Sequence, residues 1–134
     1  MFAFHHIGVA VSSLEDAVRV YQQVFQYQIL SGPFVDPIQR VRVCFVGTKT
    51  GPDAVVELVA PDAPDSPIGT VLSKGIGAYH VCYEVKALEP ALAHVRASGC
   101  VIVSNAVPAV AFGGRRIAWF YMPTRQLVEL LEEV

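Results

Sequence analysis

The stretch His-Ile-Gly-Val-Ala-Val at residues 6–11 decides the fold, because the chain repeats it 74 positions later as His-Val-Cys-Tyr-Glu-Val at residues 80–85. Both copies begin with a histidine, and a Leu-Glu pair follows each histidine at the same distance. Further along, Val-Glu-Leu at residues 56–58 returns at residues 128–130 with nearly the same shift. The sequence therefore predicts a duplicated module in which each copy carries one histidine and one glutamate.

Hydrophobic periodicity within each copy predicts a strand, a helix and further strands. Alternation over residues 4–11 places His6 on the face opposite to Ile7 and Val9. Ser13 is a candidate N-cap for a helix whose apolar residues recur at helical spacing as far as Phe25. The later elements expected are strands at 41–47, 54–59, 80–85, 101–103, 117–121 and 126–131, a short helix at 68–73 and a longer one that ends before Gly99.

These elements predict two βαβββ modules in a single domain, which is an α+β fold. Module 1 is expected to cover about residues 1–61 and module 2 about residues 77–134, with a linker at 62–76. The pairs Gly32-Pro33 and Asp36-Pro37 are interpreted as breaks, and a turn is expected at 48–53.

Composition excludes several classes of function. A chain of 134 residues with 53% hydrophobic residues can bury a core, and its net charge of −2, without any Lys/Arg run, argues against nucleic acid as a partner. No apolar run reaches the roughly 20 residues that span a membrane, and no signal peptide is recognisable, so we expect a cytoplasmic protein. The three cysteines are an odd number at unrelated spacings, and we expect reduced thiols.

The repeated histidines and glutamates predict a metal site. Glu57 and Glu129 each stand between apolar neighbours, and a buried carboxylate is costly unless it is neutralised or finds a cation. Together with His6 and His80 they offer two neutral imidazoles and two carboxylates, a set that suits one divalent ion of Co, Ni, Mn, Fe or Zn better than Ca or Mg. The alternative is that all four are ordinary strand residues, with both glutamates exposed at edges.

The chain resembles the vicinal oxygen chelate (glyoxalase, bleomycin resistance and dioxygenase) superfamily, and within it the methylmalonyl-CoA epimerases. The resemblance implies paired modules in a curled eight-stranded mixed sheet that cups a metal, with His6, Glu57, His80 and Glu129 as the ligands. It also implies a homodimer. The segments that carry it are residues 6–11, 56–58, 65–68, 77–85, 114–120 and 127–130.

The resemblance implies proton abstraction next to a metal-chelated carbonyl, with the metal as Lewis acid, Glu129 as a base and a methylmalonyl-CoA-like thioester as substrate. An epimerase also needs a base on the opposite face of the substrate. Where that glutamate is expected this chain has Ile38, which cannot carry a proton, and Asp36 stands two residues away. The expected function is therefore a metal-dependent isomerase that has lost one base.

Two alternatives remain open. A glyoxalase I-like lyase has the same ligand types and uses one glutamate as a proton shuttle. A non-catalytic module that binds small molecules or natural products, as in resistance proteins, would need no metal, and Phe34, Phe112, Trp119 and Tyr121 would line its cup unless they fill the core. For a small-molecule substrate we expect contacts from Trp119, Tyr121 and the arginines Arg115 and Arg116, which suit a carboxylate or phosphate.

Overall fold

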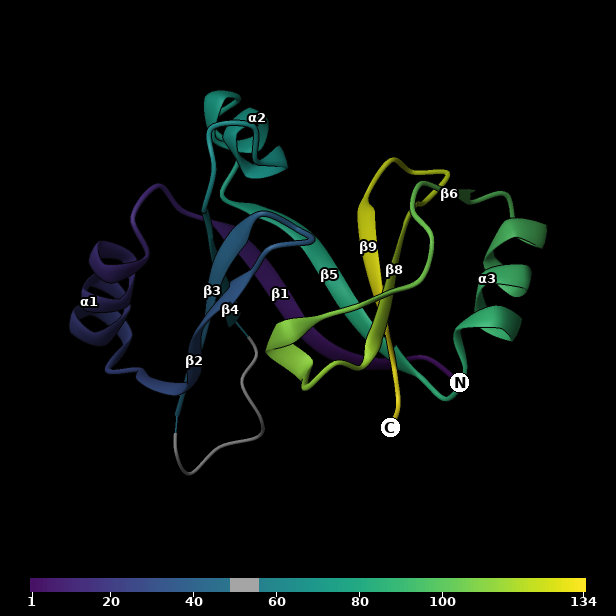
Figure 1. Ribbon diagram of the computed structural model, residues 1–134, viewed down its shortest axis with the longest axis horizontal. Coiled ribbons are helices and arrows are strands. Elements are labelled where there is room, and N and C mark those ends of the chain that lie inside the picture. Colours follow the sequence, from purple (N-terminus) through teal and green to yellow (C-terminus); the bar gives the residue numbers. More distant parts are fainter. Residues whose placement is uncertain (49–55) are drawn as a thin grey trace. The chain divides into compact units, whose positions relative to one another are not determined.

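The computed structural model describes residues 1–48 and 56–134 (Figure 1). Contacts within the chain divide it into two compact units, one formed by residues 6–79 and the other by residues 1–5 together with 80–134. We refer to them as the first and second unit and describe each by itself.

The first unit contains four strands of mixed direction and two helices. In the order β2-β3-β4-β1, β1 runs parallel to β4 and the other neighbours are antiparallel. The elements are β1 (Ala3–Ala10, which begins in the second unit), α1 (Leu14–Phe25), β2 (Gln28–Asp36), β3 (Val41–Gly47), β4 (Val56–Pro61) and α2 (Pro67–Ser73).

Helix α1 covers one face of these strands. Its N-cap is Ser13, whose hydroxyl oxygen accepts a hydrogen bond of 3.2 Å from the backbone N–H of Asp16. Leu14 and Val18 are the buried residues of the helix, and they pack against Leu58 and other apolar side chains of β3 and β4. Each buried leucine contributes roughly 1.5–3 kcal/mol through removal of its surface from water, which holds α1 on this face.

The second unit repeats this arrangement. Its strands follow the order β5-β9-β8-β6, with β5 parallel to β9 and β7 paired to β8. The elements are β5 (Ala78–Val85), α3 (Leu88–Ala97), β6 (Val101–Ile102), β7 (Val107–Pro108), the 3₁₀ turn η1 (Val110–Phe112), β8 (Arg116–Tyr121) and β9 (Leu127–Glu132).

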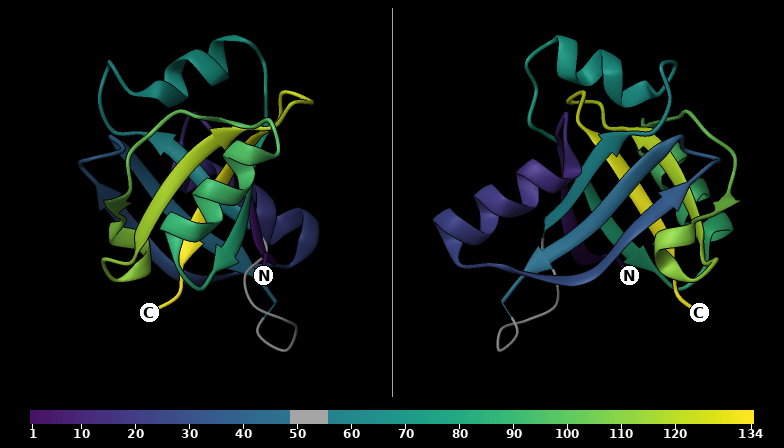
Figure 2. Two further views of the ribbon diagram at one scale, coloured as in Figure 1. Left: turned by 90° about the vertical axis from the view of Figure 1, so that its right-hand side faces the viewer. Right: turned by 60° about the vertical axis from the view of Figure 1, so that its left-hand side comes forward.

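Helix α3 lies across the strands of its own unit (Figure 2). Leu88 and Val95 of the helix are buried against Val85, Phe120 and Leu130 of the strands. These strand residues alternate with His80, Trp119 and Glu129 along β5, β8 and β9. The helix therefore covers one face of the strands and leaves the histidine and the glutamate on the other.

The structure confirms an α+β fold and the βαβββ order of the first half, and it corrects the strand count of the second half. Nine strands are present in residues 1–48 and 56–134 instead of eight, because Val107 and Pro108 form the short strand β7. Strand β2 runs through Gly32-Pro33, which the sequence analysis interpreted as a break, and shifts in its register with β3 at Ser31 and Phe34 absorb the irregularity.

Two further predictions concern the segment around residues 48–59 and the absence of a membrane span. The turn expected at 48–53 and the start of the strand expected at 54–59 lie largely outside the described residues. Among the residues that are described, no helix is both long and apolar enough to cross a membrane.

Candidate functional site

The first unit holds a buried histidine–glutamate pair. His6 lies on β1 and Glu57 on β4, and the Nε2 atom of His6 is 3.3 Å from Oε1 of Glu57. The histidine is 0% exposed and the glutamate 6%. Leu58, the next residue of β4, packs under α1, so alternation along the strand puts Glu57 on the opposite face.

The second unit holds the equivalent pair. His80 on β5 and Glu129 on β9 approach each other to 3.5 Å between Nε2 and Oε1. Both are buried, with exposed fractions of 4% and 3%. Leu130 packs under α3, which again places the neighbouring glutamate on the face that the helix does not cover.

The two pairs are built by the same register. In the first unit Gly8 faces Glu57 across the parallel strands, and His6 precedes that glycine by two residues. In the second unit Cys82 faces Glu129, and His80 precedes the cysteine by two residues. The histidine and the glutamate that repeat in the sequence therefore form the same arrangement in each unit.

An aromatic ring supports each histidine. Phe45 of β3 faces Glu57 in the strand register and meets His6 edge to face, with ring centroids 5.4 Å apart and an interplanar angle of 83°. Trp119 of β8 faces Glu129 and meets His80 in the same way, at 4.8 Å and 86°. Each imidazole thus contacts an aromatic ring beside its carboxylate.

The burial of Glu57 and Glu129 contradicts the alternative in which both carboxylates are exposed at strand edges. Each unit instead presents an imidazole nitrogen and a carboxylate oxygen on one face, away from bulk water. These atoms are ligands for a first-row divalent metal, which would also compensate the charge of the buried carboxylates. The donor chemistry therefore fits a metal.

The two arginines predicted to contact the substrate are bound to carboxylates of the second unit. Arg116 binds Glu89 of α3 with two hydrogen bonds of 2.8 and 3.0 Å and Glu132 of β9 with two of 2.8 Å. These contacts lie on the face covered by α3, opposite to Glu129. The guanidinium of Arg115 binds Glu84 and donates to the backbone carbonyl of Glu132 at 2.8 Å.

The sequence analysis assigned no role to Glu132, yet its carboxylate accepts hydrogen bonds from both Leu88 and Arg116 in the second unit. Helix α3 begins after Ala87, which offers no side-chain cap, and Oε2 of Glu132 instead accepts a hydrogen bond of 2.8 Å from the backbone N–H of Leu88. The hydrogen bonds from Arg116 and from Leu88 lower the pKa of Glu132 below its ordinary value. The one signal in the sequence is the absence of a polar residue at position 87, which means that the N–H groups at the start of α3 need an acceptor from elsewhere in the chain.

The aromatic residues differ in exposure. Trp119 is half-buried beside His80, whereas Tyr121 at the end of β8 is 43% exposed. Phe112 packs with the buried cluster that includes Cys82 and Ile117, as expected for a core residue. Phe34 lies on β2 in the first unit.

The segment around the expected second base is a turn between β2 and β3. Asp36 is buried, and its Oδ1 atom accepts hydrogen bonds of 3.0 Å from the backbone N–H groups of Ile38 and Gln39. This carboxylate therefore holds the turn together. The side chain of Ile38 is 51% exposed.

The three cysteines, all within the described residues, form no disulfide, as expected. Cys44 and Cys82 are buried and Cys100 is half-buried. Burial raises the pKa of the Cys44 thiol. These residues fill apolar space.

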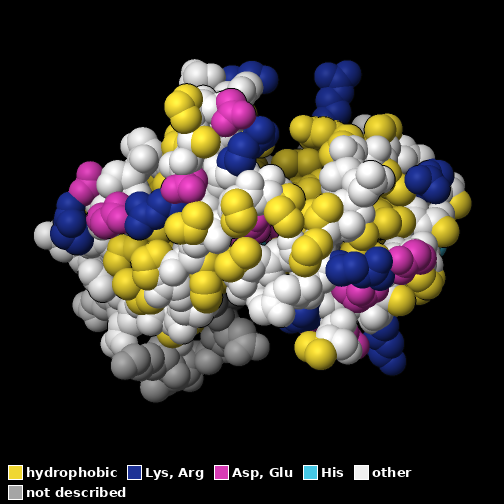
Figure 3. Space-filling model, in the orientation of Figure 1, with side chains coloured by type: hydrophobic (Ala, Val, Ile, Leu, Met, Phe, Trp, Pro, Cys, Tyr) yellow, Lys and Arg dark blue, Asp and Glu magenta, His cyan; other side chains and the backbone are white. Residues whose placement is uncertain are grey.

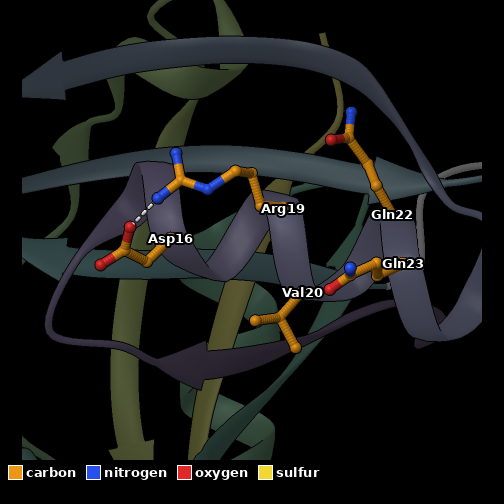
Figure 4. A pocket seen from close by; sticks show the side chains of 5 residues that line it. All are labelled: Asp16, Arg19, Val20, Gln22 and Gln23. Atoms are coloured by element: carbon orange, nitrogen blue, oxygen red, sulfur yellow. Dashed lines mark hydrogen bonds and ion pairs between the residues drawn. The ribbon is translucent and has the colours of Figure 1, made fainter.

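A surface hollow lies along exposed residues of α1 (Figure 4). It has a volume of about 630 Å³ and is lined by Asp16, Arg19, Val20, Gln22 and Gln23. Asp16 and Arg19 form an ion pair across it.

Hydrophobic side chains gather over α1 and β2 in the same unit (Figure 3, yellow). Exposed apolar side chains of this kind are common on proteins and define no chemistry.

Comparison with protein families agrees with the fold. Residues 5–119 match the model of the glyoxalase/bleomycin resistance protein/dioxygenase superfamily. The chain belongs to this superfamily, also called the vicinal oxygen chelate superfamily.

Individual relatives are similar to the chain over nearly its whole length. It is 27% identical to an ethylmalonyl-CoA/methylmalonyl-CoA epimerase of Cereibacter sphaeroides over 87% of this chain and 86% of that protein. The crystal structure of methylmalonyl-CoA epimerase from Mycobacterium tuberculosis matches with a TM-score of 0.84 at 24% identity, covering 98% of this chain and 88% of the other. A variant of the Streptomyces coelicolor methylmalonyl-CoA epimerase, in complex with 2-nitronate-propionyl-CoA, matches with a TM-score of 0.82 at 23% identity, covering 100% and 99%. The epimerase branch is thus represented among both the sequence and the structural relatives.

Proposed function

We propose that the two histidine–glutamate pairs together hold one divalent metal ion of Co, Ni, Mn, Fe or Zn. The observation that carries the proposal is the burial of an imidazole–carboxylate pair in each unit, with the same strand register and the same aromatic support. Two carboxylates and two neutral imidazoles balance the charge of a divalent ion. The proposed ligands are His6, Glu57, His80 and Glu129.

We propose further that the chain is a metal-dependent isomerase that abstracts a proton next to a carbonyl. The bound metal would supply a Lewis acid for the carbonyl oxygen, which makes the neighbouring C–H proton more acidic. Glu129 is the group that takes the proton, since its buried carboxylate lies on the face that α3 leaves uncovered and is held by β9 opposite Trp119. A carboxylate in such a site is an effective general base.

The leading substrate is a methylmalonyl-CoA-like thioester. Support comes from the similarity to epimerases of methylmalonyl-CoA, at identities between 23% and 27%. Because Ile38 stands where the second base is expected, the proposed enzyme has a base on only one face of the substrate. It therefore exchanges the substrate proton faster than it inverts the stereocentre. Substrate contacts from Arg115, Arg116, Trp119 and Tyr121, a homodimer and a cytoplasmic location remain predictions.

Two measurements test the function. Elemental analysis of protein purified without chelator should find near one metal ion per chain. Deuterium uptake into racemic methylmalonyl-CoA in heavy water should then be fast for the wild type and abolished in Glu129→Gln, with an unchanged melting temperature for the metal-free protein. Glu133→Gln is the matched control, because Glu133 is exposed near the end of the same strand and should behave as the wild type.

The outcomes separate the alternatives. Metal without deuterium uptake would contradict the thioester substrate and direct attention to a glutathione adduct, as for a glyoxalase I-like lyase. Protein without metal, even after incubation with Co²⁺ or Zn²⁺, would overturn the enzyme proposal in favour of a binding module. Full activity of Glu129→Gln would exclude this residue as the base.

A further inference from the structure

The indole N–H of Trp119 is a buried hydrogen-bond donor that meets no acceptor in residues 1–48 and 56–134. The backbone N–H of the same residue donates to Oγ of Ser104 at 2.9 Å, but Nε1 of the side chain has no acceptor among the described residues. A buried donor without a partner costs about 1–3 kcal/mol. The donor lies in the second unit, on a ring that contacts His80 and faces Glu129 across the strands.

The duplicated module provides an internal comparison. Phe45 and Trp119 are 74 positions apart, the same shift that relates His6 to His80. Both rings meet their histidine edge to face and both stand opposite a glutamate in the strand register. Because a phenyl ring suffices to support the imidazole of His6, the N–H of Trp119 is not needed for that support. The indole N–H is a feature that the second unit adds.

We infer that the indole N–H of Trp119 donates a hydrogen bond to an anionic oxygen of the ligand that His80 and Glu129 help to hold. The inference rests on the proposed function and identifies the acceptor as a carboxylate or nitronate oxygen. A neutral donor is suited to this place, because a second cation would compete with the metal for the carboxylate of Glu129. Trp119 is therefore a positioning residue for the charged end of the substrate, and it carries no proton in the reaction.

Replacing Trp119 by phenylalanine tests the donor, because the substitution removes the N–H and keeps a ring as at Phe45. The dissociation constant of 2-nitronate-propionyl-CoA should rise by about tenfold to a hundredfold in Trp119→Phe loaded with Zn²⁺, as expected for a lost hydrogen bond to a charged group. Propionyl-CoA, whose acyl group carries neither a carboxylate nor a nitronate, should bind wild type and variant equally. Calorimetry should show the same affinity for Zn²⁺ in both proteins.

A second readout uses the single tryptophan of the chain. In protein labelled with ¹⁵N-tryptophan, the one indole N–H resonance should move downfield when the nitronate ligand is added to the Zn²⁺ form, and it should stay in place with propionyl-CoA. Unchanged affinity in Trp119→Phe, or an equal loss for both ligands, would overturn the inference while leaving the proposed function intact. Failure of the wild type to bind Zn²⁺ or the nitronate ligand at all would overturn the proposed function, and this inference with it.

Discussion

The carboxylate of Glu132 caps helix α3 through the backbone N–H of Leu88, 44 residues earlier in the chain, at a distance of 2.8 Å. The same carboxylate accepts two hydrogen bonds from Arg116, whose other contacts are with Glu89 in the first turn of the helix. This link ties α3 to the strand that carries Glu129. The stability of the second unit therefore depends on a charged group that lies three residues from the proposed base.

We expect the pH dependence of stability to reveal this network. Hydrogen bonds from Arg116 lower the pKa of both Glu132 and Glu89 below the ordinary value of 4.5. A carboxylate with a lowered pKa in the folded state stabilises the fold above its ordinary pKa, and this contribution is lost as the pH falls through the lowered value. Urea unfolding at pH 7 and pH 3 should show a smaller difference in the free energy of unfolding for Arg116→Gln than for the wild type. An equal difference in both proteins would show that the ion pairs are screened by water.

The cap and the charge of Glu132 can be separated by two variants. Glu132→Gln retains an oxygen for the N–H of Leu88 and loses only the ion pair, so we expect it to be less destabilised than Glu132→Ala. The alanine variant loses both interactions and should cost about 1–3 kcal/mol in denaturant unfolding at pH 7. Glu133→Ala, next along the chain and exposed, serves as control. Equal stabilities of the two Glu132 variants would contradict the capping role.

Sequence periodicity predicted most of the fold because the apolar residues that face α1 and α3 alternate regularly along the strands. It missed β2, since Gly32-Pro33 normally interrupts a strand. The proline is tolerated because β2 is the edge strand in the order β2-β3-β4-β1. One side of β2 therefore pairs with no other strand among the described residues of this unit. Strand β7 was missed because two residues are too few to show a period.

The candidate ligands were predictable for a different reason. His6 and Glu57 recur in phase as His80 and Glu129, and the same register rebuilds the same pair in each unit. The roles of Arg116 and Glu132 were not predictable, because they depend on contacts between residues far apart in the sequence. No local pattern in the sequence shows that an arginine binds two carboxylates of its own chain.

The N-cap of α1 is a local feature that stability measurements can check. Ser13→Ala removes the acceptor for the N–H of Asp16 and should lower the free energy of unfolding by about 1 kcal/mol. Ser12→Ala is the matched control, because Ser12 is exposed and outside the cap. Equal stability of the two variants in denaturant unfolding would mean that water replaces the cap.

Asp36 is expected to act on the turn and not on the substrate. Asp36→Ala leaves the N–H groups of Ile38 and Gln39 without their acceptor and should cost about 1–3 kcal/mol in unfolding free energy. Asp36→Asn keeps an acceptor oxygen and should cost less. Neither variant should change the rate of deuterium uptake per folded molecule. A large loss of uptake in Asp36→Asn with normal stability would instead identify Asp36 as a base.

Restoring a carboxylate at position 38 tests whether the second base limits inversion. The side chain of Ile38 is 51% exposed, so Ile38→Glu should change the free energy of unfolding by less than about 0.5 kcal/mol. A positioned base typically contributes about 10² to 10⁴ in rate, and even a poorly aligned one should raise the ratio of epimerisation to deuterium uptake well above that of the wild type. Ile38→Gln is the matched control, because it adds polarity without a titratable group. The ratio is measured by following both enantiomers of methylmalonyl-CoA in heavy water. If the glutamate and glutamine variants invert the substrate at the same rate, position 38 lies outside the path of the proton, and the absence of a carboxylate there does not explain a one-sided reaction.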